Sequence, residues 1–321
     1  IEKKSREYEI EDVFRTYGVL TREAGFYFYF SRKIRELREC GHEGTARAYA
    51  SSLRSMQRYL GKKDFPFIKL SSRIISDYQG KLLASGICDN TIGFYLHNIK
   101  ALFRKGCREM GLELPCPFRD ISIKTEKTLK RSLDPVVIKT LSAIELEKDS
   151  PLSLARDIFM FSFYTRGMSF VDIALLKKRH VFPGEICYRR HKTDQLMRVG
   201  INKEISRILE RYKNVPGEYI FPLFPAERDP YAGYRSAYHR IRYSLGKISR
   251  VIGLEFPLRL HAARHSWATI AKVNGASVHV IGECLGHTSE KTTRIYLKEL
   301  DHSALDAVNN QVADFILAVD D

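Results

Sequence analysis

The chain lacks the sequence features that define secreted, zinc-binding and membrane-spanning proteins. Its six cysteines among 321 residues are scattered, and no two form a Cys-x-x-Cys pair. This argues against a zinc site and a disulfide framework, and it favours reduced thiols in a cytosolic protein. No apolar run approaches the roughly 18 residues that span a membrane, and the first residues contain no signal-peptide hydrophobic segment. We therefore expect a cytoplasmic protein with no membrane partner.

Acidic clusters and internal repeats are also missing. No group of acidic residues indicates a two-metal centre, so we expect a chemistry that uses no metal ion and no other cofactor. Positive charge, in contrast, is abundant: the chain has 53 Lys and Arg residues and 38 Asp and Glu residues, which gives a net charge of +15. Residues 1–125 carry 23 basic and 15 acidic side chains, and the remainder carries 30 and 23. Because both halves are basic, we expect a protein that surrounds a polyanion such as DNA.

The first half predicts a small helical domain over residues 21–123, after an N-terminal extension of residues 1–20. Apolar residues at helical spacing, interrupted by glycines, predict four helices: Thr21–Glu39, Thr45–Leu60, Ser72–Ser85 and one opened by Asn90 or Thr91. Two of them carry basic stripes, which are either solvated outer faces or surfaces that bind DNA. These stripes comprise Arg47, Arg54 and Arg58, and Lys100, Arg104 and Arg108.

A polar segment over residues 124–134 is predicted to be a linker, because it lacks apolar periodicity. Its basic side chains, which include Lys127, Lys130 and Arg131, are suited to a phosphate backbone. Residues 135–302 then alternate between helices and one hairpin, which predicts a mainly helical α+β domain with a small antiparallel sheet. We expect the hairpin around the turn HKTDQ and helices at Pro135–Glu147, Ser153–Tyr164, Lys203–Tyr212 and Tyr231–Ile252.

The most informative stretch lies near the end, where His261, Arg264, His287 and Tyr296 fall within 36 positions. A helix beginning near Leu260 would place His261 and Arg264 on one face, because they are three residues apart. His287 follows a glycine that suits the end of one helix, and Thr288 or Ser289 caps the helix EKTTRIYLKEL. His287 is thus predicted at a corner between two helices.

These residue types permit phosphodiester transesterification. A tyrosine hydroxyl is a weak nucleophile but a good leaving group, with a pKa of about 10. Arginines stabilise a pentavalent phosphoryl group, and histidines bind its oxygens or move a proton. A lysine on a hairpin turn is a reasonable acid for the departing oxygen. Each residue also has a structural alternative, since Tyr296 is one of 17 tyrosines and Arg264 could form a surface ion pair.

The two segments resemble the signature boxes of the tyrosine recombinases, the phage integrase family. HAARHSWAT resembles the box H-x-x-R-H-(S/T)-x-A-T, and LGHTSEKTTRIY resembles the box L-G-H-x-S-x-x-T-T-x-x-Y. The segment RRHKTDQLMRVGI is similar to the lysine hairpin of the family, which implies that Lys192 is the general acid. FYTRGMSFVDIALLKKRHV is similar to the first arginine box, which implies that Arg166 is a second phosphate clamp.

This arginine box departs from the usual pattern. The family has an acidic residue three positions after the arginine, whereas Asp172 follows Arg166 by six. The difference looks like an insertion of GMS, and it is associated with integrases and invertases of mobile elements. Residues 21–123 resemble the SAM-like core-binding domain. The segment SALDAVNNQVADFILAV, within residues 303–321, is predicted to form a C-terminal helix that either packs onto its own domain or, as in the related recombinases, docks into a neighbouring subunit.

The resemblance implies a bacterial site-specific DNA recombinase, associated with the nucleoid, that clamps inverted-repeat sites. Tyr296 would form a 3′-phosphotyrosyl link, and a homotetramer assembled on DNA from monomers or weak oligomers would integrate, excise or invert a segment. Two alternatives remain from the sequence. A type IB-like topoisomerase shares this chemistry, and a non-catalytic DNA-binding regulator could share the scaffold. Tyr296 argues against the regulator, because a binding protein has no need of a nucleophile.

Overall fold

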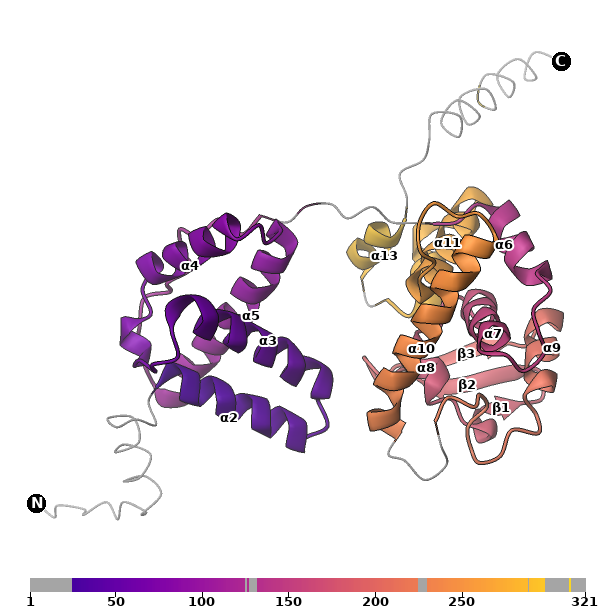
Figure 1. The fold of residues 1–321 in the computed structure, drawn as a ribbon, viewed down its shortest axis with the longest axis horizontal. Helices are drawn as coiled ribbons and strands as arrows, with labels where there is room; N and C mark the ends of the chain where they lie inside the picture. The colour runs from indigo at the N-terminus through magenta and orange to yellow at the C-terminus, as the bar shows by residue number, and fades with distance from the viewer. Residues whose placement is uncertain are drawn as a thin grey trace, which may run out of the picture. The chain divides into compact units, whose positions relative to one another are not determined.

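The computed structural model describes residues 25–124, 126, 132–224, 230–287, 289–297 and 312. The chain divides into two compact units, residues 1–128 and 129–321 (Figure 1). The division falls inside the segment predicted to be a linker. Outside the described residues lie the predicted extension 1–20, the linker side chains Lys127, Lys130 and Arg131, and, except for Val312, the segment 303–321. Within the described part, no helix combines the length and apolar character needed to cross a membrane.

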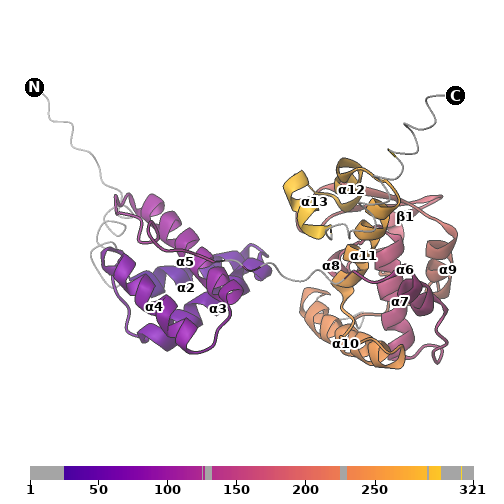
Figure 2. The same ribbon diagram turned by 90° about the horizontal axis from the view of Figure 1, so that it is seen from above.

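The described part of the first unit consists mainly of helices (Figure 2). They pack around a core that is rich in aromatic residues. The ring of Phe67 meets the ring of Phe26 edge-on at 5.0 Å and stacks with that of Phe103 at 5.8 Å. Buried aromatic rings contribute large apolar areas, which is why a unit of this size can hold its helices together. The helices are α2 (Phe26–Glu39), α3 (Glu43–Leu60), α4 (Ser72–Ala84) and α5 (Asp89–Met110), with a 3₁₀ turn at Phe67–Lys69.

Helix α2 begins at Phe26, so the predicted start at Thr21 is wrong. Gly25 is extended and forms an isolated bridge with Pro66. The Asp64 carboxylate accepts hydrogen bonds from the backbone nitrogens of Tyr27 (2.8 Å) and Phe28 (2.9 Å). An acidic side chain from a distant loop thereby satisfies the donors that a helix start leaves unpaired. This cap lies more than thirty residues away in sequence, so local patterns do not reveal it.

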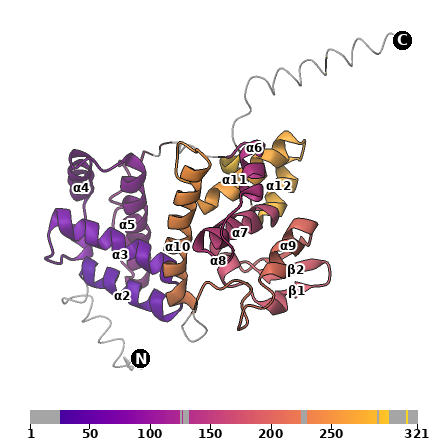
Figure 3. The same cartoon turned by 45° about the vertical axis from the view of Figure 1, so that its right-hand side comes forward.

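The second unit is built around α7 (Pro151–Tyr164), which contacts α6, α8, α9, α10 and α11. The long helix α10 runs along one side of this unit (Figure 3). Buried positions of α7 include Ile158, Phe159 and Phe161, which belong to a single apolar core with residues of the sheet and α10. The other helices are α6 (Pro135–Ala143), α8 (Phe170–Ala174), α9 (Lys203–Arg211), α10 (Pro230–Val251), α11 (Leu260–Val273), α12 (Val278–Leu285) and α13 (Glu290–Tyr296).

The predicted hairpin is present as β2 (Glu185–Arg189) and β3 (Leu196–Gly200). Ile186 pairs with Val199 and Tyr188 with Met197, so all four apolar side chains face the core. The sequence missed β1 (Val181–Phe182), a strand of two residues that pairs with β2 and completes an antiparallel sheet of three strands. The alternation of apolar residues in β2 and β3 fixes which face is buried.

Several helix ends differ from the predictions. α6 stops at Ala143 rather than Glu147, because Ile144 has a non-helical ψ of 127° and its carbonyl accepts a hydrogen bond from Arg156 Nη1 at 2.8 Å. α13 stops at Tyr296, since Leu297 is extended. α7 and α5 each begin one to two residues before the predicted start, at Pro151 and Asp89.

Candidate active site

Arg264 connects three segments of the second unit. It lies on α11 and is only 5% exposed. Its Nη1 donates to the carbonyl of Gly167 at 2.9 Å, and its Nη2 donates to the carbonyl of Leu285 and lies 3.0 Å from His287 Nε2. Burial of a guanidinium is unfavourable unless its donors are satisfied. The contacts therefore fix Arg264 between the turn after α7 and the end of α12.

Gly167 allows this close approach. A Cβ atom at this position would lie 2.5 Å from Cγ and 2.7 Å from Cβ of Arg264, and the backbone has φ of +75°. The preceding residue, Arg166, also has a positive φ of +59° directly after the C-cap of α7. Non-glycine residues adopt this conformation at a cost, and such residues gather at functional sites. The chain thus turns sharply with an arginine at the apex.

His287 lies at the predicted corner between two helices. Gly286 ends α12 in the left-handed region, with φ of +62°, and Ser289 caps α13 by accepting from the nitrogen of Thr292. His287 Nδ1 lies 3.0 Å from Thr293 Oγ1. Because the Arg264 guanidinium only donates, Nε2 must accept, and the neutral ring then carries its proton on Nδ1 and donates it to Thr293.

The surroundings keep this imidazole neutral. Burial, followed by the positive charges of Arg264, Arg190 and Lys192, lowers the pKa of His287 to about 4. Burial and like charge both disfavour the protonated ring. At neutral pH, His287 therefore has a lone pair on Nε2 that is directed at a cation.

The turn that carries Lys192 is fixed by a buried carboxylate. Asp172, on α8, accepts from the backbone nitrogen of His191 at 2.8 Å and from Ser169 Oγ at 2.6 Å. Lys192 itself is exposed, and its charge acts on His287. The acidic residue that follows Arg166 by six positions therefore connects the arginine turn to the lysine turn.

The hydroxyl of Tyr188 lies among the same cations. Burial and then Asp172 raise its pKa, whereas Arg190, Arg264 and Arg166 oppose this effect in that order. The charges of Arg166 and Arg264 thus meet in one region. His261 joins them from α11: it lines a cavity of about 220 Å³ together with Gly167 and Arg264, and its ring meets that of His265 edge-on at 4.9 Å.

Tyr296 is the last residue of α13, and its side chain lies outside the described residues. The backbone nevertheless places it three residues beyond Thr293, the hydrogen-bond partner of His287. The structure therefore brings together Arg166, Lys192, His261, Arg264 and His287 from four separated segments. In the part of the chain that is described, no three His, Cys, Asp or Glu residues are placed to hold a metal ion.

The two predicted basic stripes of the first unit do not share one pocket. Arg54 and Arg58 line a cavity of about 130 Å³ beside Tyr95, whereas Arg104 and Arg108 line another of about 410 Å³ beside Cys107. In addition, Arg47 pairs with Glu43 at 2.7 Å, and Lys100 Nζ lies 6.0 Å from the ring centre of Phe118.

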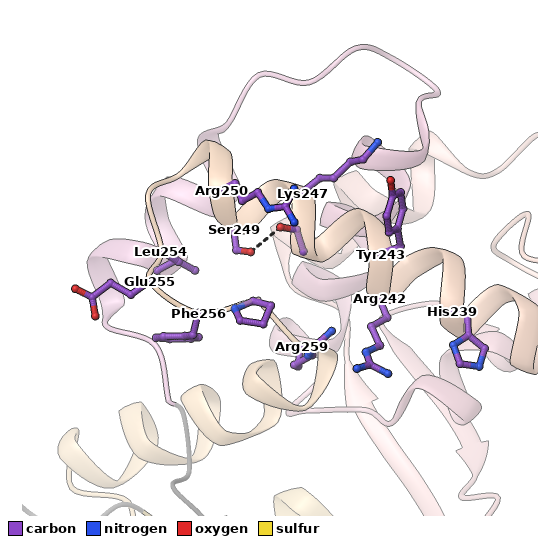
Figure 4. A pocket seen from close by; sticks show the side chains of 12 residues that line it. His239, Arg242, Tyr243, Lys247, Ser249, Arg250, Leu254, Glu255, Phe256 and Arg259 are labelled. Carbon is purple, nitrogen blue, oxygen red and sulfur yellow. Dashed lines mark hydrogen bonds between the residues drawn. The ribbon is translucent and has the colours of Figure 1, made fainter.

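A third basic surface, which the sequence did not indicate, lies on α10 and the segment that follows it. Figure 4 shows side chains from α10 and residues 254–259 around one hollow, with a volume of about 570 Å³. Arg242, Lys247, Arg250 and Arg259 are exposed and form no ion pair with a described carboxylate. Lys247 Nζ lies 4.8 Å from the ring centre of Tyr243. We name these four cations the α10 basic surface.

Other residues of the site were also missed. Gly167, Arg190 and Thr293 lie inside the segments that carry the resemblance, but their roles depend on partners 97, 96 and 6 residues away. Only the unusual spacing between Arg166 and Asp172 gave a signal, since this segment contains Gly167. Asp172 was noted for its displaced position, and its bond to the lysine turn was not predicted.

The family models match both units. The phage integrase family model covers residues 132–302, more than half of the chain, and the phage integrase SAM-like domain covers residues 25–118. The chain belongs to the phage integrase family. The predicted family and fold class, a SAM-like helical domain followed by a recombinase catalytic domain with a small antiparallel sheet, are confirmed. All six predicted catalytic residues lie within the matched range of this family.

Individual proteins with similar sequences are named tyrosine recombinases. The chain is 26% identical over 226 residues to tyrosine recombinase XerC of Shewanella oneidensis, covering 67% of this chain and 70% of the relative. It is 24% identical over 262 residues to tyrosine recombinase XerD of Pseudomonas putida, covering 79% and 86%.

Solved structures share the fold at low sequence identity. A lambda integrase dimer bound to a COC′ core site aligns with TM-score 0.63 at 16% identity, covering 87% of this chain and 97% of that one. The integrase of transposon Tn1549, in complex with a circular intermediate DNA, aligns with TM-score 0.65 at 15% identity, covering 89% and 99%.

The close approach of Gly167 to Arg264 predicts a specific sensitivity. Gly167→Ala should lower the free energy of unfolding by about 1–3 kcal/mol more than Gly184→Ala, because the added methyl group overpacks against Arg264. Gly184 is the matched control, since its φ of +84° is similarly strained but no atom lies within 4 Å of its would-be Cβ. Urea unfolding followed by the fluorescence of Trp267, the single tryptophan, measures both values. Equal losses in the two variants would contradict the packing argument.

Proposed function

We propose that this member of the phage integrase family is a site-specific DNA recombinase that cuts and rejoins DNA through Tyr296. The observation that carries the proposal is the cluster of Arg166, Lys192, Arg264 and neutral His287 around one region, assembled from segments that are distant in sequence. Preorganised cations that surround a reacting phosphate stabilise the charge of its transition state. The printed names of the relatives, tyrosine recombinases, support the same activity.

Each residue then has a role in one displacement. The Tyr296 oxygen forms a bond to phosphorus while the bond to the 5′ oxygen breaks, which leaves a 3′-phosphotyrosyl link. Arg264, Arg166 and His261 hold the non-bridging oxygens. His287 takes the tyrosine proton on Nε2 after this nitrogen exchanges its hydrogen bond from Arg264 for one from the tyrosine hydroxyl, and Lys192 gives a proton to the leaving oxygen. Attack by a 5′ hydroxyl reverses these steps, so the link conserves the bond energy.

DNA is the proposed partner of the basic surfaces on both units. We assign phosphate contacts to the α10 basic surface and to the predicted set Arg47, Arg54, Arg58, Lys100, Arg104, Arg108, Lys127, Lys130 and Arg131. The fold neighbours include a lambda integrase dimer on a core site and a tetramer on a Holliday junction. By analogy, we propose a homotetramer on inverted-repeat sites, joined by the segment 303–321, that integrates, excises or inverts a mobile element in the bacterial nucleoid.

The nucleophile is tested by covalent trapping. A binding site is first selected by amplifying those members of a random duplex pool that the protein retains. Duplexes of this site are then made with a nick at successive positions of one strand. Where the nick lies beside the cleavage position, the fragment with the 5′ hydroxyl diffuses away and cleavage cannot be reversed. We expect a protein–DNA adduct on a denaturing gel with the wild-type chain and none with Tyr296→Phe, which lacks the attacking oxygen. Tyr164→Phe removes a hydroxyl elsewhere in the same unit and should retain the adduct. An adduct with Tyr296→Phe would exclude the assignment, and supercoil relaxation without joint products would favour a topoisomerase.

The general acid is tested by changing the leaving group. Lys192→Ala should slow adduct formation by about 10²–10⁴-fold on ordinary DNA, because the 5′ oxygen then departs without a proton. DNA with sulfur at that bridging position should restore most of the rate, since a thiolate is a much weaker base and leaves without an acid. A deficit of equal size on both substrates would show that Lys192 has another role.

The α10 basic surface is tested by salt dependence. The double variant Lys247→Gln/Arg250→Gln should bind the selected duplex more weakly and lower the slope of log K against log salt by about 0.9 for each lost phosphate contact. The control is Arg207→Gln, which removes an exposed charge on α9 that is paired with Glu204 at 2.9 Å. Fluorescence anisotropy across a salt series gives both slopes. An unchanged slope in the double variant would place the DNA elsewhere.

A further inference from the structure

Arg190 closes the turn that presents Lys192. Its backbone nitrogen donates to the carbonyl of Gln195 at 2.9 Å. Its own carbonyl accepts from the nitrogens of Thr193 at 3.3 Å and Asp194 at 2.8 Å. The main chain of Arg190 therefore determines where this turn begins and ends.

The side chain of the same residue reaches the histidine corner. Arg190 Nη1 donates to the carbonyl of Gly286 at 2.5 Å, across 96 residues of sequence. A Cβ atom on Gly286 would lie 3.3 Å from this nitrogen and 2.9 Å from Sδ of Met197 on β3. The hairpin thus packs directly against the residue that precedes His287, and a glycine permits the contact.

Neighbouring basic residues of the hairpin are placed differently. Arg189 is exposed and donates to the carbonyl of Asp194 and, at 3.3 Å, to its carboxylate. Successive residues of an extended chain point to opposite faces, so the adjacent Arg189 and Arg190 carry the same charge but lie in different surroundings. Electrostatics agree with the geometry, because Arg190 is among the cations that lower the pKa of His287.

We propose that Arg190 is a positioning residue that couples the Lys192 turn to the His287 corner. It holds the acid and the base of the displacement at a fixed separation by joining one backbone segment to the other. The contact is charge-assisted and partly buried, which makes it stronger than an ordinary surface hydrogen bond. This inference rests on the proposed function, since Lys192 and His287 have these roles only there.

The first experiment compares substitutions on two substrates. Arg190→Met should slow adduct formation on the selected nicked duplex by about 10²-fold, the scale of a misplaced reacting group, while Arg189→Met stays near the wild-type rate. DNA with sulfur at the 5′ bridging position should remove most of this loss, because it needs no acid. Arg190→Lys, which keeps the charge and a donor, should be intermediate. A loss of equal size with oxygen and sulfur, or no loss, would overturn the proposal.

A second experiment needs no DNA. In Arg190→Met, an NMR titration should show the pKa of His287 moving from about 4 toward its ordinary value of 6.5, and the amides of His191 and Thr193 should exchange faster. Arg189→Met should leave both quantities unchanged. If neither changes in Arg190→Met, the coupling does not exist. Absence of an adduct with the wild-type chain would instead reject the proposed function, while these measurements would still decide the coupling.

Discussion

The arrangement of the second unit depends on one buried cation. Arg264 is held by the carbonyls of Gly167 and Leu285 and by His287, so α11, the turn after α7 and the end of α12 have a common contact. A buried guanidinium is tolerated only where several acceptors are already in place. The surrounding backbone is therefore constrained to supply them, and Gly167 can have no side chain.

The rest of the site adds to the positive charge that this cation introduces. Arg166, Arg190 and Lys192 add positive charge nearby, and His287 remains neutral in response. Asp172 is the buried carboxylate of this region, and its hydrogen bonds are to Ser169 and His191. Such a cluster is unfavourable for the free protein, but it provides a field that attracts and stabilises a phosphoryl group. The left-handed backbone at Arg166 is consistent with the same compromise between stability and function.

The hairpin joins the core of this unit to two segments of the site. Its strands are fixed in the core by Ile186, Tyr188 and Val199, whereas its turn extends to two other segments through Asp172 and Arg190. Asp172 follows Arg166 by six positions in the sequence, and it reaches the lysine turn through the backbone nitrogen of His191. Such contacts between backbone and side chain depend on position in space and not on separation along the chain.

The sequence by itself determined the two-part organisation, the hairpin and the identity of the family, because these follow from local periodicity and from residue types at fixed spacing. It placed His287 at a helix corner because a glycine ends one helix and a short polar residue starts the next. It could not assign the start of α2, since Asp64 caps that helix from a distant loop. Only the tertiary structure decided the tautomer of His287, the role of Asp172 and the contact of Arg190. Each of these three features depends on a contact between groups that are distant in sequence and come together only when the core has packed. Local sequence patterns therefore do not predict them.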